Sequence, residues 1–147
     1  MGHRTVLLIT LTVFASCELV SRHEVVRVLS PDGRIVAILV ETNGGATTSF
    51  GYEVRVLGKD GYRGDEVAWL YGAARSNNAY GVNLRWASDN ELLVEYLRAR
   101  EETLERSIVH VAGRDVRIAL RNGVTDAAAP AGGMLYNLEQ TRKSGNH

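Results

Sequence analysis

The apolar run 35–40 constrains the fold of this chain more than any other segment. Its six consecutive apolar residues, rich in Ile and Val, follow the turn-forming sequence Ser30-Pro31-Asp32-Gly33. Proline presets φ and glycine accepts the positive φ that closes such a turn. A run this short and this β-branched is typical of a strand covered on both faces rather than of a buried helix. We therefore expect residues 34–42 to form a central strand of a sheet.

The rest of the chain up to residue 121 shows more short strands separated by turns. Tyr52, Val54 and Val56 alternate with charged residues, which places them on one face of a strand. The predicted strands are 24–30, 34–42, 52–57, 67–71, 82–86, 92–98, 107–111 and 115–121, and the last four form two hairpins. The charged segment 100–106 fits one helical turn or a loop. This pattern predicts an all-β fold, a single antiparallel β-sandwich or partly open barrel of about eight short strands.

The N-terminus has a different pattern. A short basic start leads into the apolar run 6–15, and small residues separate this run from Cys17, which is the only cysteine. This order is typical of a secretory signal peptide, and the run is shorter than the roughly 20 residues of a membrane-spanning helix. A buried helix or an uncleaved short anchor is the alternative interpretation. A single cysteine also excludes an internal disulfide, so the fold must depend on its core.

The stretch Val13-Phe14-Ala15-Ser16-Cys17 resembles the lipobox of bacterial lipoproteins, although Phe14 stands where that family has Leu, Val or Ile. The resemblance implies that the chain is cut before Cys17 and that this cysteine becomes diacylglyceryl-modified. Two or more acyl chains anchor a protein stably to a bilayer. Glu18, rather than Asp, after the cysteine implies the outer membrane, with the protein facing the periplasm. Ordinary secretion to the periplasm is the alternative.

A wider resemblance covers most of residues 30–98. The Ser30–Gly33 turn, the valine-rich strand after it, the segment 44–52 (GGATTSFGY) and the turn 86–92 resemble a group of small bacterial lipoprotein-like proteins of unassigned activity. The resemblance implies a location and a fold, and it brings no catalytic residues. The expected organisation is a signal peptide at 1–16, a tether at 17–23, a β domain at 24–121 and a C-terminal segment at 122–147. That last segment is expected to dock in part, through a short helical or extended stretch at 134–138, and to end in disorder.

One loop is the best candidate for a site. Glycines permit close approach of a ligand to the backbone, and hydroxyls with exposed N–H groups form an anion-binding nest. The candidate residues for a ligand or a partner are Gly44, Gly45, Thr47, Thr48, Ser49 and Tyr52. A structural connection, in which the hydroxyls satisfy backbone groups, is the simpler alternative. The loop is not a nucleotide-binding P-loop, because no Lys-Ser/Thr pair follows the glycines.

The sequence contains no recognised catalytic constellation. Of the histidines, only His110 falls on a predicted strand, where it is expected to face solvent, so we expect neither a metal site nor a cofactor. No serine lies in a Gly-x-Ser-x-Gly elbow. The arginines on outward faces (Arg55, Arg85, Arg117, Arg121) are expected to pair with glutamates across strands. The aromatic residues Trp69, Tyr71, Tyr80 and Trp86 are expected to anchor the core or the loops.

Charge narrows the choice of partners. The 17 basic residues equal the 17 acidic residues, which disfavours nucleic acid as a partner. The sequence thus predicts a membrane-tethered, non-catalytic binding or structural module, with loops 44–51 and 72–81 as its contact surface. Its partner would be another envelope protein or a cell-wall component. An inhibitor of a periplasmic or foreign cell-wall hydrolase, and an unrecognised hydrolase, are the alternatives.

Overall fold

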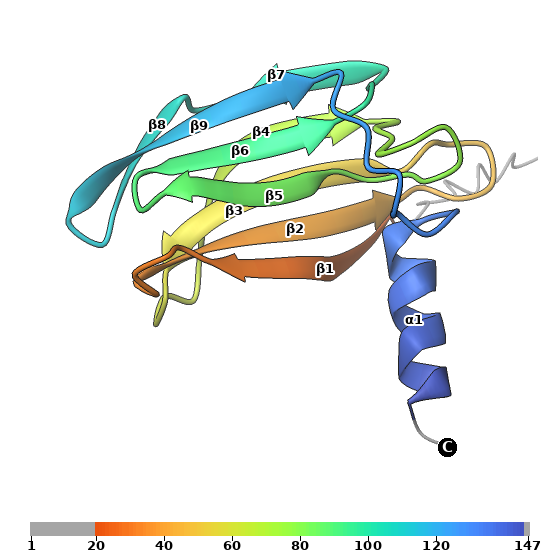
Figure 1. Ribbon diagram of the computed structural model, residues 1–147, viewed down its shortest axis with the longest axis horizontal. Helices are drawn as coiled ribbons and strands as arrows, with labels where there is room; N and C mark the ends of the chain where they lie inside the picture. Colours follow the sequence, from red (N-terminus) through yellow and green to blue (C-terminus); the bar gives the residue numbers. More distant parts are fainter. Residues whose placement is uncertain (1–19, 146–147) are drawn as a thin grey trace, which may run out of the picture.

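A computed structural model describes residues 20–145 of the chain, and Cys17 with the predicted signal peptide lies outside that range. Nine strands and one helix occupy the described part (Figure 1). The five-stranded sheet has the order β1-β2-β3-β4-β7, and the four-stranded sheet has the order β5-β6-β9-β8. The bounds are β1 Ser21–Leu29, β2 Ile35–Asn43, β3 Gly51–Gly58, β4 Asp65–Tyr71, β5 Asn83–Ser88, β6 Glu91–Tyr96, β7 Glu101–Leu104, β8 Ile108–Val111, β9 Arg114–Asn122 and α1 Met134–Ser144. The all-β prediction is confirmed.

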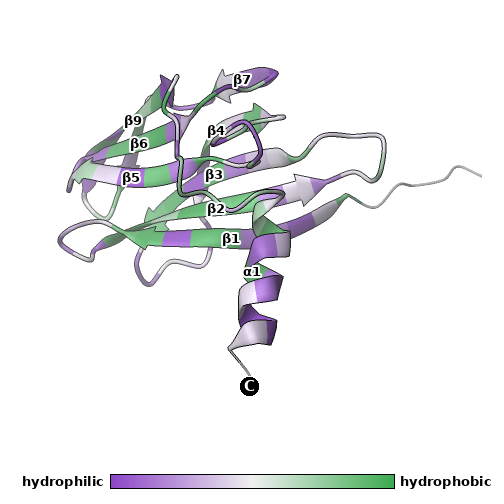
Figure 2. Cartoon of the chain, turned by 45° about the vertical axis from the view of Figure 1, so that its right-hand side comes forward, coloured by the Kyte–Doolittle hydropathy of each residue, from purple (hydrophilic) through white to green (hydrophobic). Residues whose placement is uncertain are grey.

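The core lies between the two sheets. Alternate residues of β2, β3 and β4 point inward and meet the inward residues of β5, β6, β8 and β9, as expected for two sheets packed face to face. Hydrophilic and hydrophobic residues alternate along several strands (Figure 2). The largest fully buried side chains are Tyr52, Tyr96, Ile35, Leu39, Leu70, Leu92, Val36, Val54, Val56, Val67, Val82 and Val94. This core requires no disulfide.

Strand β2 is central, as its apolar run predicts. It pairs with β1 on one side and with β3 on the other, and both pairings are antiparallel. Ile35 and Leu39 pack into the core, while Val36 and Ile38 form a second buried cluster with Leu57 on the opposite face of the same sheet. Both faces of β2 are therefore covered.

One strand pair is not antiparallel. Strand β9 lies beside β6 in parallel register, with Leu92 opposite Ile118 and Val94 opposite Leu120. A parallel pair requires a crossover connection. Here the crossover contains β7, which pairs with β4 in the other sheet, and β8, which returns to form the predicted hairpin with β9. The segment 101–104 is thus an edge strand and not the predicted helical turn or loop.

The two ends of the described chain also differ from the prediction. Strand β1 begins at Ser21, within the segment assigned to a tether, because 21–24 pairs with the end of β2. Helix α1 continues to Ser144 through residues expected to be disordered. It stands off one end of the sandwich, and beyond its first turn it is mainly hydrophilic (Figures 1 and 2). Within residues 20–145, no helix has the length and apolar character needed to cross a bilayer.

Candidate binding surface

The candidate loop 44–50 connects β2 to β3 and uses several of its polar groups internally. The amide of Gly45 donates to Asn43 Oδ1 at 2.9 Å, and Thr48 donates to the Gly45 carbonyl through its amide at 3.2 Å and its hydroxyl at 3.1 Å. The amide of Ser49 donates to the Tyr71 hydroxyl at 2.9 Å. These three amides are therefore not free to bind an anion, which favours the structural interpretation for this part of the loop.

Tyr52 does not belong to the surface of that loop. It is the second residue of β3 and points into the core, where it is fully buried. Its hydroxyl donates to Glu41 Oε2 at 2.8 Å. Burial and the adjacent Glu41 carboxylate raise the pKa of the Tyr52 hydroxyl above its usual range. The same alternation that predicts an inward Tyr52 therefore removes it from the candidate contact residues.

Glu41 has a structural role that no local pattern in the sequence indicates. Its side chain is only 3% exposed, and its carboxylate accepts the backbone N–H of Met134 at 2.9 Å and of Leu135 at 3.4 Å. The residue before α1 is Gly133, which has no side chain with which to cap the helix. A carboxylate at a helix N-terminus satisfies free N–H groups and interacts favourably with the helix dipole. Glu41 therefore caps α1 from the neighbouring sheet.

The loop 72–81 is held rigidly. The amides of Arg75 and Ser76 both donate to the Ala79 carbonyl, at 2.8 and 3.3 Å. The hydroxyl of Ser76 accepts the amides of Asn78 and Ala79. Asn77 and Asn78 at its tip remain exposed. The loop thus presents a fixed polar tip to the solvent.

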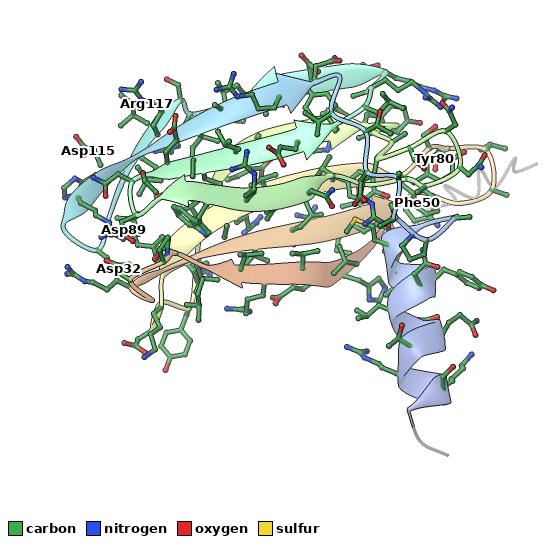
Figure 3. The ribbon with its side chains drawn as sticks, viewed as in Figure 1. Asp32, Phe50, Tyr80, Asp89, Asp115 and Arg117 are labelled. Atoms are coloured by element: carbon green, nitrogen blue, oxygen red, sulfur yellow. The ribbon has the colours of Figure 1, made fainter. Side chains whose placement is uncertain are left out.

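Backbone hydrogen bonds join the loops at this end of the sandwich. The amide of Gly72 donates to the Phe50 carbonyl at 2.8 Å, which connects loops 44–50 and 72–81. The amide of Tyr80 donates to the Gly132 carbonyl, and the amide of Gly132 donates to the Asn78 carbonyl, both at 2.9 Å. These two bonds connect the segment that precedes α1 to loop 72–81. The rings of Phe50 and Tyr80 also meet edge to face, with centroids 5.3 Å apart (Figure 3). Three segments far apart in the sequence therefore form one surface.

This surface has a compositional property that is visible in the sequence. The segments 42–52, 76–84 and 127–138 contain no Asp, Glu, Lys or Arg, although 23% of the chain is charged. We call the surface formed by these three segments the uncharged end. At the opposite end of the sandwich, the turn 30–34 and the loop 58–66 contain several charged residues. The three uncharged segments can be found in the sequence, but their meeting in one surface is seen only in the structure.

Aromatic and basic side chains project at or beside the uncharged end. Tyr80 is 45% exposed and Tyr136 is 59% exposed. Arg98 and Arg100, in the connection between β6 and β7, are also exposed. Arg98 Nη1 donates to the Asn77 side-chain oxygen at 3.1 Å, which positions it beside the tip of loop 72–81. The surface therefore combines uncharged polar groups, two exposed tyrosines and two arginines.

At the opposite end of the sandwich, which we call the charged end, an ion pair between side chains connects the two sheets. Arg114 donates to both carboxylate oxygens of Asp32, at 2.5 and 3.0 Å, and so links the β1–β2 turn to the start of β9. The carboxylate of Asp89 accepts the amide of Asp32 at 2.9 Å (Figure 3). The Arg114 guanidinium holds the pKa of Asp32 well below its usual range. A hollow of about 550 Å³ lies beside this contact, lined by charged and glycine residues.

The remaining residues singled out in the sequence have structural roles. Trp69 and Tyr71 stack with centroids 5.8 Å apart on the outer face of the five-stranded sheet. Trp86 Nε1 donates to the Val28 carbonyl at 3.1 Å and so connects the two sheets. The carboxylate of Glu53, only 2% exposed, pairs with Arg22 and Arg55. The expected pairing across neighbouring strands is found for Arg85 with Glu95 and, at 3.8 Å, for Arg55 with Glu66. Among residues 20–145, Arg117 and Arg121 form no such pair.

His110 faces solvent as predicted. Its Nδ1 lies 2.8 Å from Asp115 Oδ1, and both side chains are about 70% exposed. Catalysis by a general base requires a substrate held within hydrogen-bond reach, and an exposed pair of this kind encloses none. Across residues 20–145, no group of three or more His, Cys, Asp or Glu side chains could hold a metal ion.

The chain was compared with family models, with curated proteins and with solved structures, and none of the three comparisons gives a match.

Proposed function

We propose that this chain is an envelope lipoprotein that acts as a non-catalytic binding module. In this proposal the signal peptide 1–16 is removed, Cys17 carries acyl chains, and the sandwich faces the periplasm. Two features of the structure support it. Val20 is 54% exposed and directly precedes the edge strand β1, so this end of the described chain lies at the surface of the sandwich. The uncharged end offers a broad, fixed surface for contact.

The observation that carries the binding role is the cross-connection of loops at the uncharged end. Loops that are already held by hydrogen bonds lose little conformational entropy when they bind, which favours association. The same loops leave Asn77, Asn78 and two tyrosines exposed.

The anchoring is tested by fractionating cells that produce Cys17→Ser, with Ser16→Ala as a matched control. Ser16→Ala retains a small residue before the cysteine, so this variant and the wild type should both sediment with membranes. Cys17→Ser should appear in the soluble periplasmic fraction. Mass spectrometry of the mature wild-type chain should find acyl chains on Cys17. Membrane sedimentation of Cys17→Ser, or an intact Met1 in the mature chain, would contradict lipid anchoring.

The fixed tip of loop 72–81 also favours inhibition of a cell-wall hydrolase as a second candidate function, because rigid protruding loops can fill a cleft. A crosslinker placed at Asn78 distinguishes the two functions. Capture of a single hydrolase, together with inhibition of that enzyme by the purified protein and not by an Asn78→Trp variant, would favour the inhibitor. Unchanged hydrolase activity at saturating protein would exclude it for that enzyme.

A further inference from the structure

The place where the chain enters the sandwich determines which end lies near the anchor. Ser21, the first residue of β1, pairs with Asn43 at the border of loop 44–50. An extended chain advances at most about 3.6 Å per residue, so Ser21 lies within about 14 Å of an acylated Cys17. The far end of the nine-residue strand β2 is about 27 Å away from Asn43 at the usual rise per residue. The uncharged end is therefore the end within reach of the bilayer.

The chemistry of the two ends also separates them. Bringing a charged surface close to the apolar part of a bilayer requires removal of its water, which is unfavourable. The charged end carries the Asp32–Arg114 ion pair, and the outer face of the five-stranded sheet carries the Arg22–Glu53–Arg55 cluster. The three segments of the uncharged end contain no ionisable acid or base apart from tyrosine. These three segments can thus approach lipid without loss of hydrated charges, and the exposed charges beside them include Arg98, Arg100 and Glu101.

Its exposed side chains match the headgroup region. Tyrosine is enriched at membrane–water interfaces because its ring is apolar and its hydroxyl is polar, and Tyr80 and Tyr136 are both exposed here. Arginine can contact lipid phosphates with its guanidinium while its stem covers apolar surface. Arg98 and Arg100 are exposed beside the tip of loop 72–81. The bordering Asp126 carboxylate is already bonded to the Asn83 side chain and to the amide of Ala128.

From this geometry we propose that the uncharged end lies against the phospholipid headgroups of the membrane that holds Cys17. The inference rests on the proposed function, since it requires the acylated cysteine. The sandwich then stands with its strands directed away from the bilayer and with its charged end in the periplasm. The partner of loops 44–50 and 72–81 is the lipid surface itself, and not a molecule that approaches from the aqueous phase.

The experiment uses one label at each end. Asn78 and Asn90 are both exposed asparagines in turns, the first at the uncharged end and the second beside Asp89 at the charged end. Asn78→Cys and Asn90→Cys are purified in the acylated form and given an environment-sensitive thiol dye. In the acylated protein the Cys17 sulfur forms a thioether, so only the introduced thiol reacts. The unsubstituted protein is the control and should take up no dye. Dye uptake by this control would show a free Cys17 and would contradict the proposed function before the orientation is examined.

The labelled proteins are reconstituted in vesicles of phosphatidylethanolamine and phosphatidylglycerol that contain a headgroup-level quencher lipid. The dye of Asn78→Cys should be quenched at least threefold more than the dye of Asn90→Cys. Equal quenching, or stronger quenching of Asn90→Cys, would overturn the orientation while leaving the acylation intact. Weak quenching of both dyes in vesicles, with crosslinking of Asn78→Cys to a protein in native membranes, would also overturn it and would identify a protein partner in the same membrane.

Discussion

Different interactions stabilise the two ends of this sandwich. At the uncharged end, backbone amides and carbonyls of three distant segments bond to one another, and one buried carboxylate caps the helix. At the charged end, Arg114 forms an ion pair with Asp32 that connects the two sheets. Ion pairs are weakened by salt and by acid, whereas backbone hydrogen bonds are largely insensitive to both. One fold therefore closes its two ends by interactions that differ in their sensitivity to salt and acid.

Removal of the buried cap should have the largest effect. Glu41→Ala leaves the Tyr52 hydroxyl and two N–H groups of α1 without their acceptor in a buried site. Loss of one partner from such a site costs about 3 kcal/mol of unfolding free energy. Urea unfolding measures the change, with Glu139→Ala on the exposed part of α1 as the control, for which less than about 0.5 kcal/mol is expected. A loss equal to that of the control would show that the cap does not hold this end together.

Substitution of one glycine at each end by alanine should lower the unfolding free energy by different amounts. Gly81, at the uncharged end, has φ +120°, and a Cβ there would collide with the Met134 side chain. Gly113, at the opposite end, has φ +77° and open space around its Cβ position. Gly113→Ala should therefore lower the unfolding free energy only by the backbone term of about 1–2 kcal/mol. Gly81→Ala should lower it by about 3 kcal/mol, because Met134 must also move. Equal losses in thermal unfolding would argue against close packing of α1 at this end.

Acid should weaken the Asp32–Arg114 ion pair at the charged end. The pKa of Asp32 is lower in the folded protein than its unfolded value of about 3.9, so Asp32 stabilises the fold above that pH. This contribution is lost as the pH falls from about 4 toward the lower folded pKa. Asp32→Asn should therefore be less stable than wild type at pH 7, and the difference should shrink in acid. Asp60→Asn, in the neighbouring loop, is the control. A difference that stays constant down to pH 2 would contradict this role of the ion pair.

The exposed tips should have the smallest effect on stability. Asn78→Ser and Asn90→Ser each change one exposed side chain for which no buried partner has to be broken. Both should alter the unfolding free energy by less than about 0.5 kcal/mol. Circular dichroism with urea checks this before any binding experiment. A larger loss for Asn78→Ser would show that the tip is part of the scaffold and would weaken its use as a contact surface.

Local patterns predicted the strands well where the side chains alternate. The alternation from Tyr52 to Val56 identified both β3 and its inward face, and the apolar run identified β2 as central. Strand β7 was missed because residues 101–104 are all exposed, so no alternation marks them. The parallel β6–β9 pair joins strands that are not neighbours in the sequence, and hairpin rules pair neighbours only.

The site was harder to predict because it depends on contacts between distant residues. The extent of α1 was missed because its cap, Glu41, lies 93 residues before Met134 in the chain. The loop residues were identified, but the amides of Gly45, Thr48 and Ser49 are already used within the protein. The absence of charge in three segments was visible in the sequence. It gained meaning only when the structure brought those segments together.

The crossover through β7 has a consequence for how the protein folds. After β6 the chain leaves one sheet, adds an edge strand to the other sheet, and then returns to complete the first sheet with β8 and β9. Each sheet is therefore completed by strands that follow a segment of the other sheet in the chain. Such interleaving gives a high contact order, which slows folding. It also ties both layers into one cooperative unit, so a single sharp unfolding transition is expected, without a stable half-folded species.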